Sequence, residues 1–373
     1  MSKIGIVTLN GYFNYGNRLQ NYALQEVLKD FGFTVETIIK KSDTNSTVSK
    51  NILGKVKEKS FKEIICAANN KALNTLYRNK LKEQRTQIFR DFTKKYIVET
   101  NFSISDNNIP NDLSHSYDYF VTGSDQVWNP TYKNNSSIEF LTFASSEKRI
   151  AYAPSFGVSE IPEQKRDNYT TWLSELAHIS VREEAGAKII SELTGRDAQV
   201  LVDPTMLLTK EKWLSIAKAP SIKPKKKYLL TYFLGDIPKE RKKKINDVAK
   251  KNDLEIVHLA QIKYRIPYLS GPSEFIHYIN NASVFCTDSF HGAVFSILLD
   301  TPFIVFNREG KSPSMNSRIE TLLSKFSLES RSDNNVLSNS QIFDVDYSHT
   351  IPILKEEQKK SLDYLKNALN VKS

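Results

Sequence analysis

The sequence predicts an α/β protein built from two doubly wound domains that face a cleft, with a basic helical insertion in the first domain. Short apolar runs alternate with segments whose apolar residues recur at helical spacing, which is typical of βαβ units and parallel sheets. This alternation occurs twice, on either side of a segment rich in proline and lysine at residues 219–225. A chain of 373 residues is also longer than one hydrophobic core usually supports.

The first predicted domain, residues 1–205, opens with a βαβ unit. Residues 3–9 form a buried strand, residues 17–31 carry apolar side chains at helical spacing as far as Gly32, and residues 33–39 form the next strand. Later strands are expected at residues 117–122, 149–153, 178–181 and 199–202, with helices at 162–176 and 183–193.

Residues 41–95 interrupt this alternation. They are polar, basic and mostly helical by periodicity, and we expect them to form a helical insertion outside the sheet. Packing on their own domain is the simplest interpretation of their apolar positions. A lid or a membrane-facing surface are the alternatives.

The second predicted domain, residues 206–350, repeats the alternation. Strands are expected at residues 227–233, 254–259, 282–286 and 303–306, with helices at 238–252, 272–281 and 316–326. A C-terminal helix follows within residues 351–373. This helix could return to the first domain.

The chain is basic, with a formal net charge of +10. Much of the excess lies in residues 40–95 and in two runs at 223–227 and 239–244. Such charge attracts phosphorylated substrates, anionic lipid or nucleic acid, although a solvated helix face is its commonest meaning. Because no aromatic RNA-binding signature occurs, we expect no nucleic-acid partner.

Cysteine use and apolar run lengths favour a cytoplasmic protein. Only two cysteines occur, Cys66 and Cys286, so a disulfide framework is not expected. Residues 1–3 lead directly into the first strand without a signal-peptide pattern, and no apolar run reaches the roughly 20 residues that span a bilayer.

The most informative stretch is residues 282–306. A strand ends in Thr-Asp-Ser-Phe-His-Gly, and a helical pattern follows. Polar residues thus gather at the carboxyl end of a strand, where open α/β sheets bind ligands, and at a helix start, which binds anions. His291 can carry a proton near neutral pH, Asp288 could orient it, and Ser289 and Gly292 leave room for a ligand. A purely structural histidine is the alternative.

A second candidate is the loop of residues 10–17. Gly11 and Gly16 have the spacing of a phosphate-binding loop, but Asn17 and Arg18 replace its lysine and hydroxyl residue. Asn14, Gly16 and Asn17 still offer amides and N–H groups to a sugar or an anion. A tight turn is the alternative.

Two further segments follow strands. Asp125 can accept hydrogen bonds from sugar hydroxyls, and Trp128 can stack on a sugar, although core packing is the commoner fate of a tryptophan. Arg182 ends a strand, where it can grip a carboxylate or a phosphate; a surface Arg–Glu pair is the alternative. The scattered histidines and cysteines show no metal-ligand spacing, so no metal site is expected.

Five short motifs occur in a fixed order. They are Asn14-Tyr-Gly-Asn17 with the following Leu-Gln-Asn-Tyr-Ala-Leu-Gln, Gly123-Ser-Asp-Gln-Val-Trp-Asn129, Ser180-Val-Arg-Glu183, Val202-Asp-Pro-Thr205 and Thr287-Asp-Ser-Phe-His-Gly292. Each is weak alone, but the ordered set is specific. With it the chain resembles the polysaccharide pyruvyl transferase family from about residue 3 to residue 326, outside the insertion.

The resemblance implies two Rossmann-like domains in the GT-B arrangement, and transfer of pyruvate from phosphoenolpyruvate onto a sugar as a ketal. It also implies donor binding by Arg182 and His291 with the neighbouring Phe290 and Gly292. Ser289 completes the expected donor set. No metal or organic cofactor is required by this reaction in principle.

We hypothesise that His291, held by Asp288, acts as general acid/base or as phosphate partner, and that Arg182 grips the donor. Asn14, Gly16, Asn17, Asp125 and Trp128 would face the acceptor. A lipid-linked glycan at the inner face of the plasma membrane is a plausible acceptor, and the basic helices at residues 51–95 and 239–251 would favour that anionic surface.

Two other functions fit the same features. A nucleotide-sugar glycosyltransferase of GT-B type would share the architecture, and a non-catalytic carbohydrate-binding protein of an envelope assembly pathway would share the sugar-facing residues. Retention of Arg182 and His291 argues against a decayed site.

Overall fold

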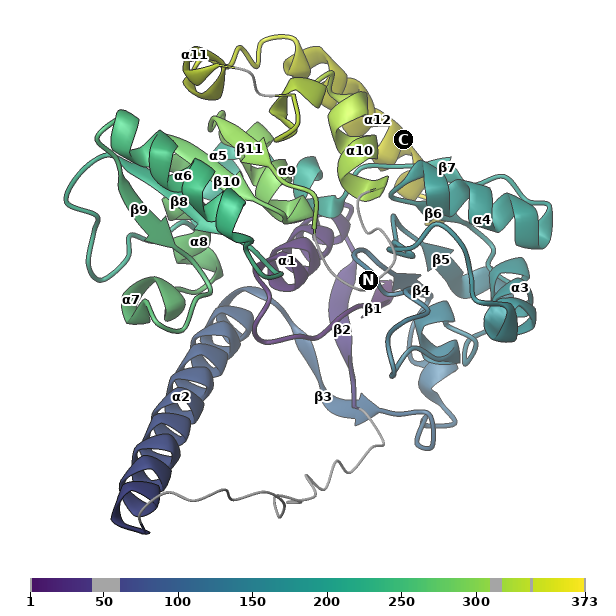
Figure 1. The fold of residues 1–373 in the computed structure, drawn as a ribbon. Coiled ribbons are helices and arrows are strands. Elements are labelled where there is room, and N and C mark those ends of the chain that lie inside the picture. The colour runs from purple at the N-terminus through teal and green to yellow at the C-terminus, as the bar shows by residue number, and fades with distance from the viewer. Residues whose placement is uncertain (1, 42–60, 309–316, 336–337, 372–373) are drawn as a thin grey trace.

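The computed structural model describes residues 2–41, 61–308, 317–335 and 338–371, and these residues form two Rossmann-like domains with parallel sheets (Figure 1). The first sheet has the order β3-β2-β1-β4-β5, and each neighbouring pair is parallel. Its strands are β1 (Lys3–Val7), β2 (Thr34–Lys40), β3 (Glu99–Ile104), β4 (Tyr119–Thr122) and β5 (Arg149–Ala151). A short parallel pair, β6 (Ser180–Val181) and β7 (Gln199–Val200), extends this domain through a bridge between Ile150 and His178.

The second sheet has the order β11-β10-β8-β9 and is also parallel. Its strands are β8 (Tyr228–Tyr232), β9 (Glu255–His258), β10 (Val284–Thr287) and β11 (Phe303–Val305). Side chains alternate between two apolar clusters: Leu229 packs with Ile245 on one face, and Leu230 packs with Phe275 on the other. Helices therefore cover both faces, as a doubly wound domain requires.

Twelve α-helices occur in the described residues. They are α1 (Tyr15–Asp30), α2 (Phe61–Tyr96), α3 (Arg166–Ser174), α4 (Glu184–Thr194), α5 (Lys210–Ser215), α6 (Lys239–Lys251), α7 (Arg265–Tyr268), α8 (Pro272–Asn280), α9 (Phe290–Leu298), α10 (Ser317–Lys325), α11 (Asn339–Phe343) and α12 (Thr350–Ala368).

Helix α1 lies between the two domains and is buried on nearly all sides. Its first residue, Tyr15, stacks on Phe275 of the second domain at a centroid distance of 4.4 Å. Several of its polar residues are buried as well, and two glutamines among them have specific partners. Gln20 donates to Thr8 Oγ1 at 2.8 Å, and Gln25 donates to Thr37 Oγ1 at 2.8 Å. These bonds offset the desolvation of the amides, so a polar sequence can occupy an interior position.

The predicted insertion is part of the first domain's sheet connection. Helix α2 links β2 to β3, an edge strand that the sequence did not reveal because its apolar and polar residues hardly alternate. Leu81, Phe89 and Phe92 are buried, so this end of α2 packs in the core. Figure 1 shows the other end extending away from both sheets. Residues 42–60 lie outside the described residues.

Arg85 of α2 joins the two domains. Its guanidinium donates to the Phe13 carbonyl of the first domain at 3.2 Å, and to the Ser270 carbonyl of the second at 3.3 Å. It also bonds the Tyr268 carbonyl and lies over the Tyr15 ring at 4.8 Å. The buried arginine therefore holds the loop before α1 against the second domain.

The C-terminal helix contacts the first domain. Tyr364 of α12 donates to the Ala151 carbonyl of β5 at 2.8 Å, and Lys360 donates to the Val200 carbonyl of β7 at 3.5 Å. The residues before α12 belong to the second domain, and α12 thus returns the chain to the edge of the first sheet (Figure 1).

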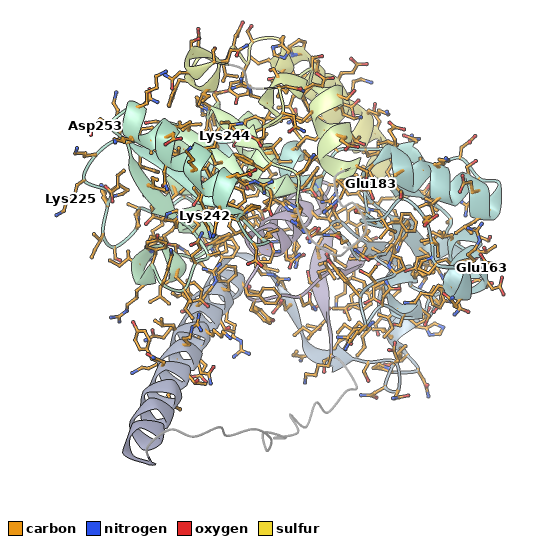
Figure 2. All side chains as sticks on the ribbon, in the orientation of Figure 1. Glu163, Glu183, Lys225, Lys242, Lys244 and Asp253 are labelled. Carbon is orange, nitrogen blue, oxygen red and sulfur yellow. The ribbon has the colours of Figure 1, made fainter. Side chains whose placement is uncertain are left out.

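Helix α6 carries one of the basic runs with its apolar residues turned inward. Ile245 and Ala249 are buried, whereas Lys239, Lys242 and Lys243 are exposed. Lys225, Lys242 and Lys244 lie in the outer part of the second domain (Figure 2). In the described residues, no helix combines the length and the apolar character needed to cross a membrane.

Candidate active site

A cavity of about 260 Å³ lies between the domains and contains most of the predicted site residues. The loop after β1 and the segment after β4 supply one wall, and the start of α9 supplies the other. These are carboxyl ends of parallel strands at the points where each sheet reverses its winding, which is the usual ligand position in such sheets. The predicted residues in its lining are Asn14, Asn17, Asp125, Ser289, Phe290 and His291.

His291 occupies the first turn of α9, directly against α1. Ser289 caps this helix, and its hydroxyl accepts a hydrogen bond from the Gly292 N–H at 3.3 Å. A Cβ placed on Gly16 would lie 2.1 Å from His291 Nδ1. Only glycine at this position lets the imidazole of the second domain reach the helix start of the first. Gly16 therefore makes room for the histidine.

The carboxylate that faces His291 is Asp203, not Asp288 as expected. Asp203 Oδ2 lies 3.5 Å from His291 Nε2. Asp288 instead accepts hydrogen bonds from the backbone N–H groups of Leu234 at 2.8 Å and Gly235 at 3.2 Å. Asp288 precedes the N-cap residue of α9, and its side chain points toward the end of β8. Its hydrogen bonds therefore connect the carboxyl ends of β8 and β10.

Arg182 is directed at two carboxylates rather than at the cavity. It donates to Asp203 Oδ2 at 2.6 Å and to Asp125 Oδ1 at 3.3 Å, and its guanidinium lies 4.3 Å from the Phe290 ring centroid. The side chain is buried and is not part of the cavity lining. Arg182 therefore holds the side chains of Asp203 and Asp125 in position.

Both carboxylates are held in the ionised form. Burial on its own would raise the pKa of Asp203, but His291, Arg182 and the Thr205 N–H outweigh it and hold that pKa well below its usual range. Burial also opposes ionisation of Asp125, and the charges of His291, Arg182 and Arg318 lower its pKa. An ionised Asp203 stabilises a positive charge on the imidazole beside it.

The loop before α1 brings its amides to the same cavity. Asn14 caps α1 by accepting from the Asn17 N–H at 3.4 Å, and the Asn17 amide donates to Asp125 Oδ2. Asp125 has a φ of 63°, in the left-handed region that few non-glycine residues adopt. Helix α1 and the segment after β4 are thus joined at the cavity wall.

Two predicted residues have structural positions instead. Trp128 is fully buried, stacks on Phe140 at 5.2 Å and donates through its indole N–H to the Glu139 carbonyl at 3.0 Å, so it belongs to the core. A Cβ on Gly292 would lie 2.7 Å from Thr287 Oγ1. Gly292 therefore allows α9 to pack closely on β10 and does not line the cavity.

Sequence reasoning missed several residues of this site. Arg308, Arg318, Phe13 and Tyr132 line the cavity. Phe13 lies in the candidate loop of residues 10–17 but was not among its predicted contacts, and no local pattern marks the other three. Burial, followed by the charge of Arg182, lowers the pKa of Arg318 to about 10, and its guanidinium lies 4.0 Å from Asp125. Asp203 was also missed, although Asp-Pro-Thr is a helix-cap pattern in which the carboxylate accepts from the Thr205 N–H at 3.0 Å.

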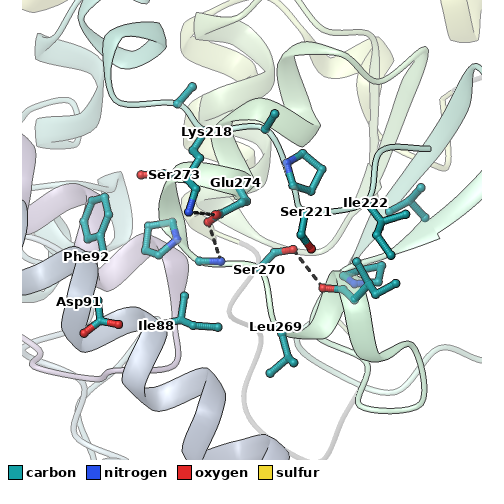
Figure 3. Close-up of a pocket in the computed structure, with 18 of the residues that line it drawn as sticks. Ile88, Asp91, Phe92, Lys218, Ser221, Ile222, Leu269, Ser270, Ser273 and Glu274 are labelled. Carbon is teal, nitrogen blue, oxygen red and sulfur yellow. Dashed lines mark hydrogen bonds and ion pairs between the residues drawn. The ribbon is translucent and has the colours of Figure 1, made fainter. Parts of the chain in front are cut away.

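A larger groove of about 1230 Å³ lies between α2, residues 215–222 and the second domain (Figure 3). Ile88 and Phe92 line it from α2, and Lys218 pairs with Glu274 at 3.4 Å on its other side. None of the predicted site residues is among the described residues that line this groove. In the same described part of the chain, no group of three or more His, Cys, Asp or Glu side chains is placed to hold a metal ion.

Replacing Gly16 by alanine should displace His291, because the new methyl group would overlap the imidazole. We expect Gly16→Ala to lower the free energy of unfolding by about 1–3 kcal/mol, measured by urea denaturation. Gly186→Ala is the matched helical control, since its Cβ would meet nothing closer than 3.3 Å. Equal effects of the two substitutions would contradict this packing.

Removing the charge of Asp203 should change the acid stability of the protein. Its folded pKa is lowered, so its contribution is complete above the unfolded value of about 3.9 and is lost as the pH falls below it. Asp203→Asn should lose about 3–5 kcal/mol at pH 7 and show a shallower decline below pH ~4 in urea denaturation. The exposed Asp253→Asn is the control, and an Asp203→Asn profile parallel to wild type would refute the assignment.

Comparison with known proteins identifies the family and little else. Solved structures that the comparison finds similar include a putative UDP-N-acetylglucosamine 2-epimerase from Listeria monocytogenes, with 11% identity, a TM-score of 0.48, and coverage of 100% of this chain and 97% of that chain. The epimerase from Rickettsia bellii has 11% identity, a TM-score of 0.49, and coverage of 99% and 97%. The E. coli heptosyltransferase WaaC with ADP has 12% identity, a TM-score of 0.36, and coverage of 85% and 90%. Likeness at this level says nothing about what this chain binds.

No curated protein matches the sequence. The family model for polysaccharide pyruvyl transferase does match, over residues 14–310, which include every motif that the sequence resemblance was based on. Since this match covers most of the chain, the protein belongs to the polysaccharide pyruvyl transferase family.

Proposed function

We propose that the protein transfers pyruvate from phosphoenolpyruvate onto a sugar of a cell-surface polysaccharide or of its lipid-linked precursor, forming a pyruvyl ketal. One observation carries the proposal. His291 and two arginines share a single cavity with amide and carboxylate side chains from the other domain. An anionic donor and a hydroxyl-bearing acceptor would each find suitable partners there.

The donor brings a carboxylate and a phosphate to the cavity. Arg308 and Arg318 line it and supply positive charge, and the start of α9, where the helix dipole favours an anion, lies in its wall. Because Arg182 does not line the cavity, whereas these two arginines do, they replace it as the groups that grip the donor.

The reaction balances without an additional reactant. One proton is added to the methylene carbon, which becomes a methyl group, and the adjacent carbon gains oxocarbenium character. Two hydroxyl oxygens of the sugar form bonds to that carbon, and its bond to the phosphate oxygen breaks. The two hydroxyl protons end on the methyl group and on the phosphate, so the products are the ketal and inorganic phosphate. No metal or organic cofactor is needed for these steps.

His291 lines the cavity and would act as the general acid and base of the transfer. Asp203, ionised and 3.5 Å away, would stabilise the imidazolium and fix the ring. On the opposite wall, Asn14 and Asn17 would donate to and accept from the acceptor's hydroxyls, and Asp125 would accept from them. Fixed charges around an oxocarbenium-like centre are expected to supply much of the rate enhancement.

Loss of the imidazole should abolish most of the transfer. We expect His291→Ala to reduce the rate by ~10²–10⁴, measured as sugar-dependent phosphate release from phosphoenolpyruvate and as a pyruvyl mass gain on candidate lipid-linked sugars. His115→Ala, at an exposed site, is the control. Near-full transfer by His291→Ala would remove this role, whereas binding of a nucleotide sugar but not of phosphoenolpyruvate would point to a glycosyltransferase.

A lipid-linked acceptor would place the protein at an anionic membrane surface. The exposed lysines of α6 support a peripheral contact of this kind. We expect the protein to float with liposomes containing phosphatidylglycerol and to remain in solution with neutral ones. Charge reversal at Lys242 and Lys243 should weaken flotation, and equal behaviour with both liposome types would contradict the contact.

A further inference from the structure

Phe13 is the most exposed large apolar side chain among the described residues, and it lines the cavity. Its relative exposure is 68%. An isolated exposed apolar side chain is ordinary on a protein surface. A phenylalanine exposed at the wall of the site that carries His291 is a different case, because a ligand bound there would cover it.

The backbone of Phe13 is bound by Arg85, a residue that contacts both domains. The carbonyl of Phe13 accepts from the buried Arg85, which also bonds the Ser270 carbonyl of the second domain. The ring itself lies over Gly11, where a Cβ would be 3.2 Å from Phe13 Cε1. The aromatic face is therefore presented on a positioned loop, which reduces the ordering that binding would require.

The cavity lining is divided by chemistry. Asp125, His291, Arg308 and Arg318 are charged or protonatable, whereas Phe13 and Tyr132 are aromatic and partly exposed, with Tyr132 at 36%. Sugars have the same division: their hydroxyls seek polar partners, and the C–H face of a pyranose packs on an aromatic ring. Sites for small ligands combine these two kinds of lining.

We propose that Phe13 is the stacking platform for the acceptor's sugar ring, with Tyr132 as a second aromatic contact. The acceptor would then be a pyranose with a continuous C–H face, which Phe13 selects while the charged residues hold the donor. This inference rests on the proposed function only in taking the acceptor to be a sugar.

The test is calorimetric titration of wild type, Phe13→Ala, Phe13→Leu and Phe13→Trp with phosphoenolpyruvate and with the methyl pyranosides of glucose, galactose, mannose and N-acetylmannosamine. We expect a sugar that binds wild type to bind Phe13→Ala about tenfold more weakly. Phe13→Trp should keep the affinity, and Phe13→Leu should lose most of it because it lacks a ring. Affinity for phosphoenolpyruvate should stay unchanged in all variants.

Tyr77→Ala is the control, since Tyr77 is a half-exposed aromatic on α2 that does not line the cavity. The proposed role of Phe13 is overturned if Phe13→Ala binds the sugar as tightly as the wild type does, or if it loses affinity equally for the sugar and for phosphoenolpyruvate. It is also overturned if the wild-type protein binds none of the sugars. Failure to bind phosphoenolpyruvate with sugar binding intact overturns the proposed transfer and leaves the platform standing.

Discussion

The burial of α1 between the two domains is the constraint on which the site depends. A helix buried on nearly all sides is usually apolar, yet α1 places Arg18, Gln20, Asn21 and Gln25 in the interior. Partners on the surrounding strands and loops offset much of the cost of this burial, such as Glu99 for Arg18 at 2.9 Å and Thr37 for Gln25 at 2.8 Å. Removing one partner would leave a buried polar group unsatisfied. These contacts therefore fix the rotation of α1 about its axis and its position along that axis. The first turn of α1 then has one position relative to the second domain.

That position explains the organisation of the cavity. Gly16 in the first turn of α1 meets His291 in the first turn of α9, so two helix starts from different domains converge. Convergence of their positive ends favours an anionic ligand. The carboxylates behind them, Asp125 and Asp203, are tied by Arg182. Positive charge at the cavity surface is thus provided by Arg308 and Arg318. Arg182 lies behind the cavity lining and holds the carboxylates of Asp125 and Asp203 in position.

Much of this could be anticipated from local pattern. The alternation of strand and helix predicted the two doubly wound domains, and polar residues after strands pointed to Asn14, Asn17, Asp125 and His291, which line one cavity. The edge strand β3 escaped notice because a strand at the rim of a sheet need not alternate. Trp128 was placed at the site because an aromatic after a strand fits a sugar as well as it fits a core, and only its packing on Phe140 separates the two.

The sequence by itself determined the fold class, the family motifs and the strand ends that carry the chemistry, because these depend on spacing along a local segment. The tertiary structure decided which side chains contact one another at the site. Asp203 rather than Asp288 faces His291, Arg182 faces inward, and Arg308, Arg318 and Phe13 join the cavity. These choices depend on which strand ends adjoin after folding, and on the direction in which each side chain leaves its backbone. Residues on different strands and helices settle them, such as His291 and Asp203, and no local pattern records such contacts.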